Sequence, residues 1–287
     1  MALSPLARRI AGLLAESARI GFLHLNDSHA ELKPDRSIVT VADREIEAFL
    51  TGELEDEAAG IRVIGEESCV KRPAAYLDAA RRGRCFIIDP IDGTAMYAHR
   101  IPFWGIIIGY AENGALVDGG IAIPGTGEML LSDCGTTFYA QSSAPMTGWD
   151  FDVVLKPLAP PPDRFDDSSL ISISQPMAHR NAMRGTNVLT AFCSTAYMTV
   201  LLATGRVAAA YNAAHIWDFG GGLRALKNLG FVSVPEFPEA GDLMTLRIDD
   251  SNFTADYGTG EALLTRCEFL FATSRECAER VLAQREM

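Results

Sequence analysis

The sequence contains no apolar segment that could cross a lipid bilayer and no signal-peptide pattern at its amino terminus. No apolar run approaches the roughly 18 to 20 residues that a membrane-spanning helix needs. Near the amino terminus, Arg8, Arg9, Glu16 and Arg19 interrupt the apolar positions. We therefore expect a cytoplasmic protein that does not bind membranes.

The chain also lacks the cysteine spacing of a zinc finger and any excess of basic residues. Its six cysteines are scattered, and several fall in apolar segments, which indicates reduced, buried thiols. The formal net charge of −12 opposes binding to nucleic acids, which recognise basic surfaces. An anionic substrate stays compatible with this charge if metal ions reverse the local field. With 287 residues, 48% of them hydrophobic, the chain can form one large domain or two closely packed halves.

Residues 85–94 are the most informative stretch, because an apolar run that predicts a buried strand ends there in two carboxylates. Asp89 and Asp92 are three residues apart, Pro90 restricts the backbone between them, and Gly93 permits unusual backbone angles where a helix can begin. Two carboxylates this close repel each other unless a proton or a cation lies between them. The stretch alone leaves two interpretations open, a magnesium site at a strand end and a solvated turn.

Other acids occupy comparable positions elsewhere in the chain. A second pair, Glu66 and Glu67, follows a short apolar run, and Asp218 stands directly before a glycine-rich helix start. Thr40 and Asp43 have the spacing of a capping box, with aspartate in place of the usual glutamate. Asp43 and Asp218 therefore each have a structural interpretation, the capping of a helix, beside a catalytic or metal-binding one.

The pattern of apolar residues predicts an α+β half over residues 1–145 and an α/β half over residues 146–287. In the first half we expect helices at 3–25 and after residue 40, a strand at 61–64, a charged loop at 71–84 and antiparallel strands over 103–140. Residues 150–167, rich in proline and aspartate, predict a surface connection. In the second half we expect strands at 170–174, 188–193, 207–211, 231–234 and 269–272, and helices at 194–204, 219–229 and 274–285.

The glycine-rich stretches do not form a phosphate loop. Residues 125–127 and 258–260 both read Gly-Thr-Gly but lack the strand, the length and the lysine of such a loop, so we interpret them as turns. Residues 220–222 are three glycines at a predicted helix start, where each costs about 1 kcal/mol against alanine. Close approach of that helix start to a ligand would compensate for this cost.

Taken together, these motifs resemble the inositol monophosphatase family. The resemblance rests on Gly-Glu-Glu-Ser at 65–68, Asp-Pro-Ile-Asp-Gly-Thr at 89–94 and Trp-Asp at 217–218, and it runs through nearly the whole chain. It implies the layered αβαβα sandwich that this family shares with fructose-1,6-bisphosphatase, and a homodimer. It also implies an enzyme that needs magnesium, is inhibited by lithium, and hydrolyses a small phosphorylated metabolite.

The resemblance further implies which residues bind two magnesium ions. Glu66 and Asp89, with the backbone carbonyl of Ile91, would hold one ion. Asp89, Asp92 and Asp218 would hold the second, and a third, weaker ion through Glu66 stays open. This set of oxygen ligands suits magnesium better than zinc, which prefers histidine and cysteine.

The resemblance implies hydrolysis by a metal-activated water, without a protein nucleophile or a phosphoenzyme. Glu66 and Thr94 would position this water, with Asp43 accepting a hydrogen bond from the Thr94 hydroxyl. Backbone N–H groups of Gly93 and Thr94 would hold the phosphate. Two metals about 3.5 to 4 Å apart can lower the pKa of a water and stabilise the leaving oxygen.

The substrate side departs from the pattern of the inositol-specific members. Those members contact the sugar alcohol through a stretch like Gly-Ser-Ala-Ala, whereas residues 193–196 read Cys-Ser-Thr-Ala, with Ser194 and Thr195 at its centre. They also carry a substrate-binding acid seven residues before the Trp-Asp aspartate, where this chain has Tyr211. A site that has lost a carboxylate for hydroxyl groups discriminates differently. The remaining expected substrate and phosphate contacts are Asp92, Gly93, Thr94 and Asp218.

Several alternatives stay open. Lys33, Asp35 and Ser37 are similar to residues of histidinol-phosphate phosphatases and adenosine-3′,5′-bisphosphate phosphatases. A catalytically silent relative that binds a phosphorylated metabolite is an alternative of another class, although all the metal carboxylates are present. A glycosidase with two catalytic carboxylates would explain neither the Gly-Thr turn nor the number of acids.

Overall fold

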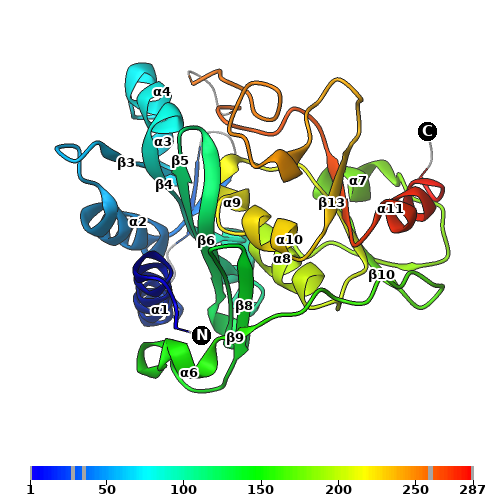
Figure 1. Cartoon of the computed structure of the whole chain (residues 1–287), viewed down its shortest axis with the longest axis horizontal. Helices are drawn as coiled ribbons and strands as arrows, with labels where there is room; N and C mark the ends of the chain where they lie inside the picture. Colours follow the sequence, from blue (N-terminus) through cyan, green and yellow to red (C-terminus); the bar gives the residue numbers. More distant parts are fainter. Residues whose placement is uncertain (1, 27–29, 34–36, 258–260, 286–287) are drawn as a thin grey trace.

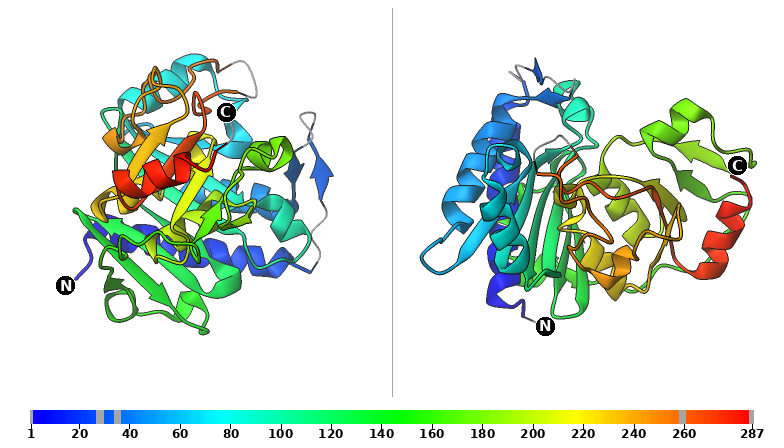
Figure 2. Two further views of the ribbon diagram at one scale, coloured as in Figure 1. Left: turned by 90° about the vertical axis from the view of Figure 1, so that its right-hand side faces the viewer. Right: turned by 90° about the horizontal axis from the view of Figure 1, so that it is seen from above.

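Five alternating layers of helices and sheets build the molecule (Figure 1), in a computed structural model that describes residues 2–26, 30–33, 37–257 and 261–285. The order of layers confirms the αβαβα sandwich. The outer helices of the first layer are α1 (Pro5–His24) and α2 (Val41–Leu54). Seen from above, they lie on one side of the first sheet, and the second half of the chain lies on the other (Figure 2). The middle helical layer is α8 (Thr195–Ala203), α9 (Ile216–Phe219) and α10 (Leu223–Asn228).

The first sheet has seven strands whose spatial order follows the chain. They are β3 (Ile61–Gly65), β4 (Arg84–Asp92), β5 (Gly105–Glu112), β6 (Ala115–Ile123), β7 (Glu128–Asp133), β8 (Thr136–Gln141) and β9 (Lys156–Pro157). Only β3 and β4 pair in parallel, so the predicted antiparallel strands are confirmed. The β5–β6 hairpin turns at Asn113 and Gly114, whose φ angles of 52° and 74° suit a type I′ turn.

Successive side chains of these strands point alternately into the two large cores, one on each face of the sheet. Ile88, Ile106 and Ile108 pack against α1 and α2 on one face of the sheet. Ile87 and Ile107 pack on the other face against the middle helices. Because successive side chains of a strand point to opposite faces, strands that are apolar throughout must be buried on both sides.

The second sheet has five strands and lies beyond the middle helices. Its spatial order is β11 (Val188–Thr190), β10 (Leu170–Ser172), β12 (Ala209–Asn212), β14 (Phe269–Ala272) and β13 (Val232–Pro235). The last layer is α7 (Gln175–Arg180) and α11 (Arg275–Leu282), which cover a third, smaller core. The shorter elements are β1 (Glu31–Leu32), β2 (Ile38–Val39), α3 (Glu66–Cys69), α5 (Thr94–Ala98), α6 (Phe151–Val154) and 3₁₀ turns at Pro124–Thr126, Met146–Gly148 and Leu243–Thr245.

Some helices form where the sequence did not predict a helix. The charged loop expected at 71–84 is wrong, because α4 (Ala74–Arg82) forms there and buries Leu77 and Ala80. The helix is amphipathic, but it is short and most of its residues are polar or small, so the stretch resembles a charged loop when its composition alone is considered. Helix α7 begins after Ser174, whose hydroxyl accepts a hydrogen bond from the N–H of Met177 and so caps the helix.

The connection between the halves is more structured than expected. Helix α6 forms within it, and β9 adds the last strand to the first sheet. The boundary between residues 145 and 146 stays a prediction. Residues 125–127 do form a tight turn, whereas 258–260 lie outside the described residues. All six cysteines are free, but Cys134 and Cys193 are exposed, so the expectation of buried thiols is correct for four of them.

The expectation that the three glycines at 220–222 approach a ligand is wrong. A Cβ on Gly109 of β5 would lie 2.4 Å from the carbonyl oxygen of Gly220, and one on Gly221 would lie 2.3 Å from that of Gly120 in β6. The glycines therefore allow the backbone between α9 and α10 to contact the sheet directly.

In the part of the chain that the structure describes, no helix is long and apolar enough to cross a membrane.

Candidate active site

A cleft of about 520 Å³ opens at the carboxyl end of β4, between the first sheet and the second half of the chain. Most of the predicted site residues line it, namely Glu66, Asp92, Gly93, Thr94, Ser194, Thr195, Tyr211 and Asp218. Asp89 does not line the cleft and is only 1% exposed. The fold therefore brings together segments from both halves at one strand end.

An irregularity at the end of β4 places both of its aspartates in one site. In a regular strand, residues three apart point to opposite faces of the sheet. Here Asp89 pairs with Ile107 and Asp92 with Gly105, so β4 has one residue more than β5 over this interval. The Asp89 carboxylate also accepts a hydrogen bond of 3.0 Å from the N–H of Ile91, which fixes the turn locally.

The amino terminus of α8 holds the Asp92 carboxylate. Asp92 accepts hydrogen bonds from the Ser194 hydroxyl, from the N–H of Thr195 at 3.1 Å and from the N–H of Ala196 at 2.7 Å. The positive end of the helix dipole favours an anion at this place. Ser194 and Thr195, predicted on the substrate side, thus orient a predicted metal ligand in this structure.

Asp89, Asp92 and Asp218 each place a carboxylate oxygen within 4.8 Å of the other two. Asp218 lies in the first turn of α9, where it accepts a 2.7 Å hydrogen bond from the N–H of His215 and so also caps the helix. Burial, followed by the charge of Glu66, raises the pKa of Asp89 well above its usual range. Burial, followed by the charge of Asp92, does the same to the pKa of Asp218. A cation here would relieve both effects.

Glu66 stands apart from this group of three and is paired with a lysine. The ammonium group of Lys33 lies 3.1 Å from Glu66 and 2.6 Å from Glu67. Burial raises the pKa of Glu66, and Lys33 opposes that shift. Lys33 was not predicted at the metal site, although it stands in the segment that leads to Thr40. In the sequence, Lys33 was grouped with Asp35 and Ser37. Ser37 lines the cleft, and Asp35 lies outside the described residues.

A second residue that sequence reasoning missed is Glu47 on α2. It is 5% exposed, and its carboxylate accepts a 2.8 Å hydrogen bond from the N–H of Glu67. A Cβ on Gly65 would lie 2.7 Å from the Glu47 carboxyl carbon. Glu47 therefore supports the turn that presents Glu66, and its position four residues after Asp43 on the same helix face was the available signal.

Asp43 caps α2 and also contacts Thr94, as its structural and its catalytic interpretation each require. One carboxylate oxygen accepts hydrogen bonds from the N–H of Thr40, at 2.8 Å, and from the Thr40 hydroxyl. The other lies 3.4 Å from the hydroxyl of Thr94, which donates at 3.0 Å to the carbonyl of Ile91. Burial, opposed by the Thr40 hydrogen bonds, raises the pKa of Asp43 to about 7.

Gly93 and Tyr211 mark the two sides of the cleft. Gly93 has a φ angle of 83°, and a Cβ there would lie 2.9 Å from that of Ser194, so glycine suits both the turn and the approach of α8. Tyr211 is 3% exposed, and its hydroxyl has no hydrogen-bond partner among the residues that the structure describes. Burial raises its pKa to about 12, so the phenol is neutral.

Comparison with known proteins agrees with this geometry. The model of the inositol monophosphatase family matches residues 2–282. Human inositol monophosphatase 1 is 25% identical over 259 residues, which are 86% of this chain and 87% of the human protein. Histidinol-phosphatase of Mycobacterium tuberculosis is 33% identical over 119 residues, 42% of this chain and 43% of that protein. Several curated relatives, this one included, align over less than half of their own length.

Solved structures share the fold at low sequence identity. The extragenic suppressor protein SuhB of Bartonella henselae superposes with a TM-score of 0.71 at 17% identity, covering 98% of both chains. The family model and the human relative identify a phosphatase, that is, a hydrolase of phosphoric monoesters. The chain belongs to the inositol monophosphatase family.

Proposed function

We propose that the chain hydrolyses a small-molecule phosphate monoester by a metal-activated water in a magnesium-dependent reaction. One observation carries this proposal above the others, the approach of the Asp89, Asp92 and Asp218 carboxylates within 4.8 Å in a largely buried site. Burial raises the pKa of all three carboxylates, and neighbouring carboxylates raise those of Asp89 and Asp218 further, so the group is suited to a hard divalent cation.

The donors present fit magnesium. Asp89, Asp92 and Asp218 would hold one ion, and Asp89, Glu66 and the Ile91 carbonyl would hold another, with a third ion through Glu66 left open. Every one of these ligand atoms is an oxygen, which magnesium prefers. When bound, such ions supply a water of lowered pKa and neutralise charge on the phosphate and the leaving oxygen.

Residues around this site would position water and phosphate. The Thr94 hydroxyl has two acceptors, the Ile91 carbonyl at 3.0 Å and the Asp43 carboxylate at 3.4 Å. If the Ile91 carbonyl held a cation, the Thr94 hydroxyl would donate its hydrogen to Asp43, and the hydroxyl oxygen could accept a hydrogen bond from a water molecule. Glu66 would orient that water from the other side, and the N–H groups of Gly93 and Thr94 would bind phosphate oxygens.

The far side of the cleft favours a substrate other than inositol phosphate. Tyr211 replaces the expected acid with a neutral, buried phenol, and Ser194 and Thr195 are engaged by Asp92. The carboxylate that pairs with substrate hydroxyls in the inositol-specific members is thus replaced at position 211. Histidinol-phosphatases are among the curated relatives with 32% to 33% identity, and a staphylococcal relative with 19% identity was solved with 2′-AMP bound. Histidinol phosphate and adenosine 3′,5′-bisphosphate are therefore the leading alternatives.

A panel of phosphate esters tests the proposal. Phosphate release is measured from an aryl phosphate, inositol phosphate, histidinol phosphate, adenosine 3′,5′-bisphosphate and fructose bisphosphate, each with magnesium and with a chelator. We expect magnesium-dependent release, and kcat/KM for inositol phosphate below that for at least one other ester. Release that is unchanged by the chelator would contradict the metal dependence. No release from any ester, with phosphorylated metabolites still bound, would support the silent relative.

Three further properties belong to the same proposal. Lithium is expected to inhibit the enzyme, and a staphylococcal relative of 17% identity was solved as an inhibitory complex after a soak in lithium chloride. A homodimer and a cytoplasmic location stay predictions. Sedimentation of the purified chain and fractionation of cells that express it test these two directly.

A further inference from the structure

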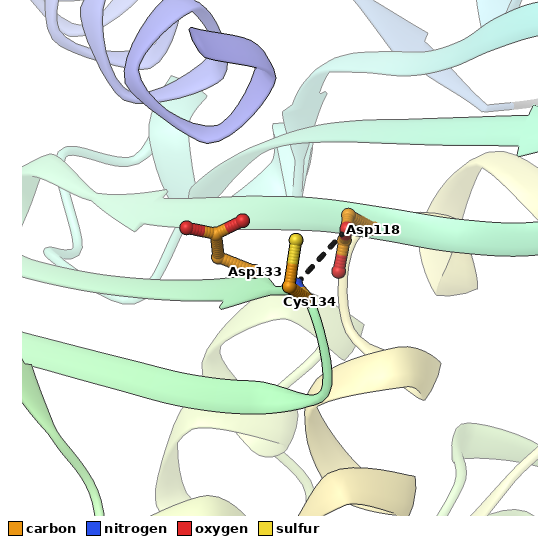
Figure 3. Close-up of side chains that lie close together, drawn as sticks. All are labelled: Asp118, Asp133 and Cys134. Atoms are coloured by element: carbon orange, nitrogen blue, oxygen red, sulfur yellow. Dashed lines mark hydrogen bonds between the residues drawn. The ribbon is translucent and has the colours of Figure 1, made fainter. Parts of the chain in front are cut away.

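Asp118, Asp133 and Cys134 form a second cluster of metal-binding side chains, away from the β4 strand end that carries the cleft. Asp118 lies on β6, Asp133 ends β7, and Cys134 begins the turn into β8. One ligand atom from each of the three residues lies within 4.8 Å of the other two. Figure 3 shows the Cys134 sulfur between the two carboxylates, with a helix crossing above them.

The two carboxylates are buried and incompletely satisfied. Asp118 is 6% exposed and Asp133 is 4% exposed. Their Oδ2 atoms accept hydrogen bonds, from the N–H of Cys134 at 3.3 Å and from the N–H of Ser4 at 2.8 Å. Their Oδ1 atoms are inaccessible to solvent and have no hydrogen-bond partner among the described residues. A buried carboxylate oxygen without a partner is costly, so something that is not a protein group is expected to satisfy both.

The surroundings of the cluster compensate only part of its negative charge. Burial raises the pKa of Asp118. Hydrogen bonds from the Cys134 N–H and the Ser132 hydroxyl oppose this shift, as does the charge of Arg224, while the charge of Asp133 adds to it. Arg224 donates its Nε hydrogen to the carbonyl of Val117. Arg224 thus opposes the pKa shift of Asp118 through its charge, and none of its described hydrogen bonds goes to that carboxylate.

We propose that Asp118, Asp133 and Cys134 bind a zinc-type transition-metal ion. The mixture of two carboxylates and a thiolate favours a borderline-soft ion over magnesium, which would take oxygen ligands only. Three protein ligands leave a fourth position of a tetrahedral site for water, and the exposed side of Cys134 gives access to it. The ion would link β6, β7 and the turn after β7 to the start of α1, because Asp133 also accepts a hydrogen bond from the N–H of Ser4.

Cobalt spectroscopy tests the site directly, because only a thiolate ligand gives a sulfur-to-cobalt charge-transfer band. The full chain is stripped with a chelator, given excess magnesium to fill the catalytic carboxylates, and titrated with Co²⁺ and then with Zn²⁺. We expect the band to grow to one equivalent of cobalt and to disappear when zinc displaces it. Thermal unfolding in the same solutions should show that zinc stabilises the protein.

Matched variants show which residues bind the ion. Cys134→Ser should abolish the band, whereas Cys193→Ser, which removes the other exposed thiol, should retain it. Asp118→Asn should weaken zinc binding by more than about tenfold, since even supporting partners of metal ligands contribute 10-fold to 100-fold. Cys134→Asn is a second test, because asparagine tolerates the φ angle of 49° at this turn and removes the thiolate.

Three results would overturn the proposal. The first is the absence of any charge-transfer band in the wild-type chain, which would mean that a shared proton, such as a thiol hydrogen donated to Asp133, satisfies the cluster instead. The second is a band that persists in Cys134→Ser and is lost in Cys193→Ser. The third is zinc stabilisation that is equal in the wild type, Cys134→Asn and Asp118→Asn. Because phosphate release is not the readout, failure here is distinguishable from failure of the proposed phosphatase activity.

Discussion

Asp43 is expected to act in catalysis through one carboxylate oxygen and in helix capping through the other, and two substitutions separate these roles. Asp43→Asn keeps the size of the side chain but provides only one acceptor oxygen. The N–H and hydroxyl of Thr40 require that oxygen. The amide NH₂ group of asparagine then faces Thr94, and it can donate a hydrogen bond to the Thr94 hydroxyl but cannot accept one.

Asp43→Asn reverses the hydrogen bond between residue 43 and the Thr94 hydroxyl, and the expected loss of activity follows from this reversal. If Asp43 receives the Thr94 proton in the reaction, Asp43→Asn should lower kcat by about 10²-fold to 10⁴-fold, the range of a positioned general base. This corresponds to roughly 2.7 to 5.4 kcal/mol of transition-state stabilisation. Thr40→Ala is the matched control, because it removes the capping hydroxyl and leaves the contact between Asp43 and Thr94. It should cost about 1 kcal/mol of stability, the usual contribution of a helix cap, and change kcat by less than about threefold.

The assay is phosphate release with saturating magnesium, alongside urea unfolding of both variants. The reasoning would be refuted if Thr40→Ala lowered kcat as much as Asp43→Asn, because capping alone would then explain the effect. It would also be refuted if Asp43→Asn kept wild-type kcat. Thr94→Ser should keep most of the activity and Thr94→Val should lose it, since only the first retains the hydroxyl.

Three further predictions concern ligands, packing and pH. Asp92→Asn should lower kcat by roughly 10²-fold or more while far-ultraviolet circular dichroism stays unchanged, because Asp92 is a proposed metal ligand and asparagine can still accept hydrogen bonds from the start of α8; near-normal phosphate release would contradict its role. Gly109→Ala should lower the free energy of unfolding measured in urea by about 1 to 3 kcal/mol, because its Cβ would lie 2.4 Å from a backbone oxygen. Gly12→Ala on α1 is the control: its Cβ meets open space, so the variant should not lose stability. In the metal-free protein, the pKa of Asp43 rises from its usual 3.8 to about 7, so the folded state binds a proton that the unfolded state does not, and the free energy of unfolding should fall as pH rises from 4 to 7. In Asp43→Asn the free energy of unfolding should fall less over this pH window, by up to a few kcal/mol. An equal fall in the variant and the wild type would exclude Asp43 as the source.

Local features of the site could be predicted because their physical causes lie within a few residues. The capping box of Thr40 and Asp43, the strand that carries Asp89 and the antiparallel strands over 103–140 all form as expected. Each depends on neighbouring backbone groups, apolar alternation or the freedom of a glycine, which a sequence displays directly. The resemblance to a known family added the layer order, which the structure confirms.

The tertiary structure decided which side chains meet. Asp92 and Ser194 are 102 positions apart, yet they form a hydrogen bond that orients a proposed metal ligand. Lys33 reaches Glu66 across 33 positions, and Asp118 meets Cys134 only because β6 and β7 are adjacent in the sheet. Sequence alone determined the local conformation of each acid and its place at the end of an element. The assembly of the layers determined their partners, because contacts between distant segments depend on the register and packing of whole strands and helices, which no single stretch of sequence contains.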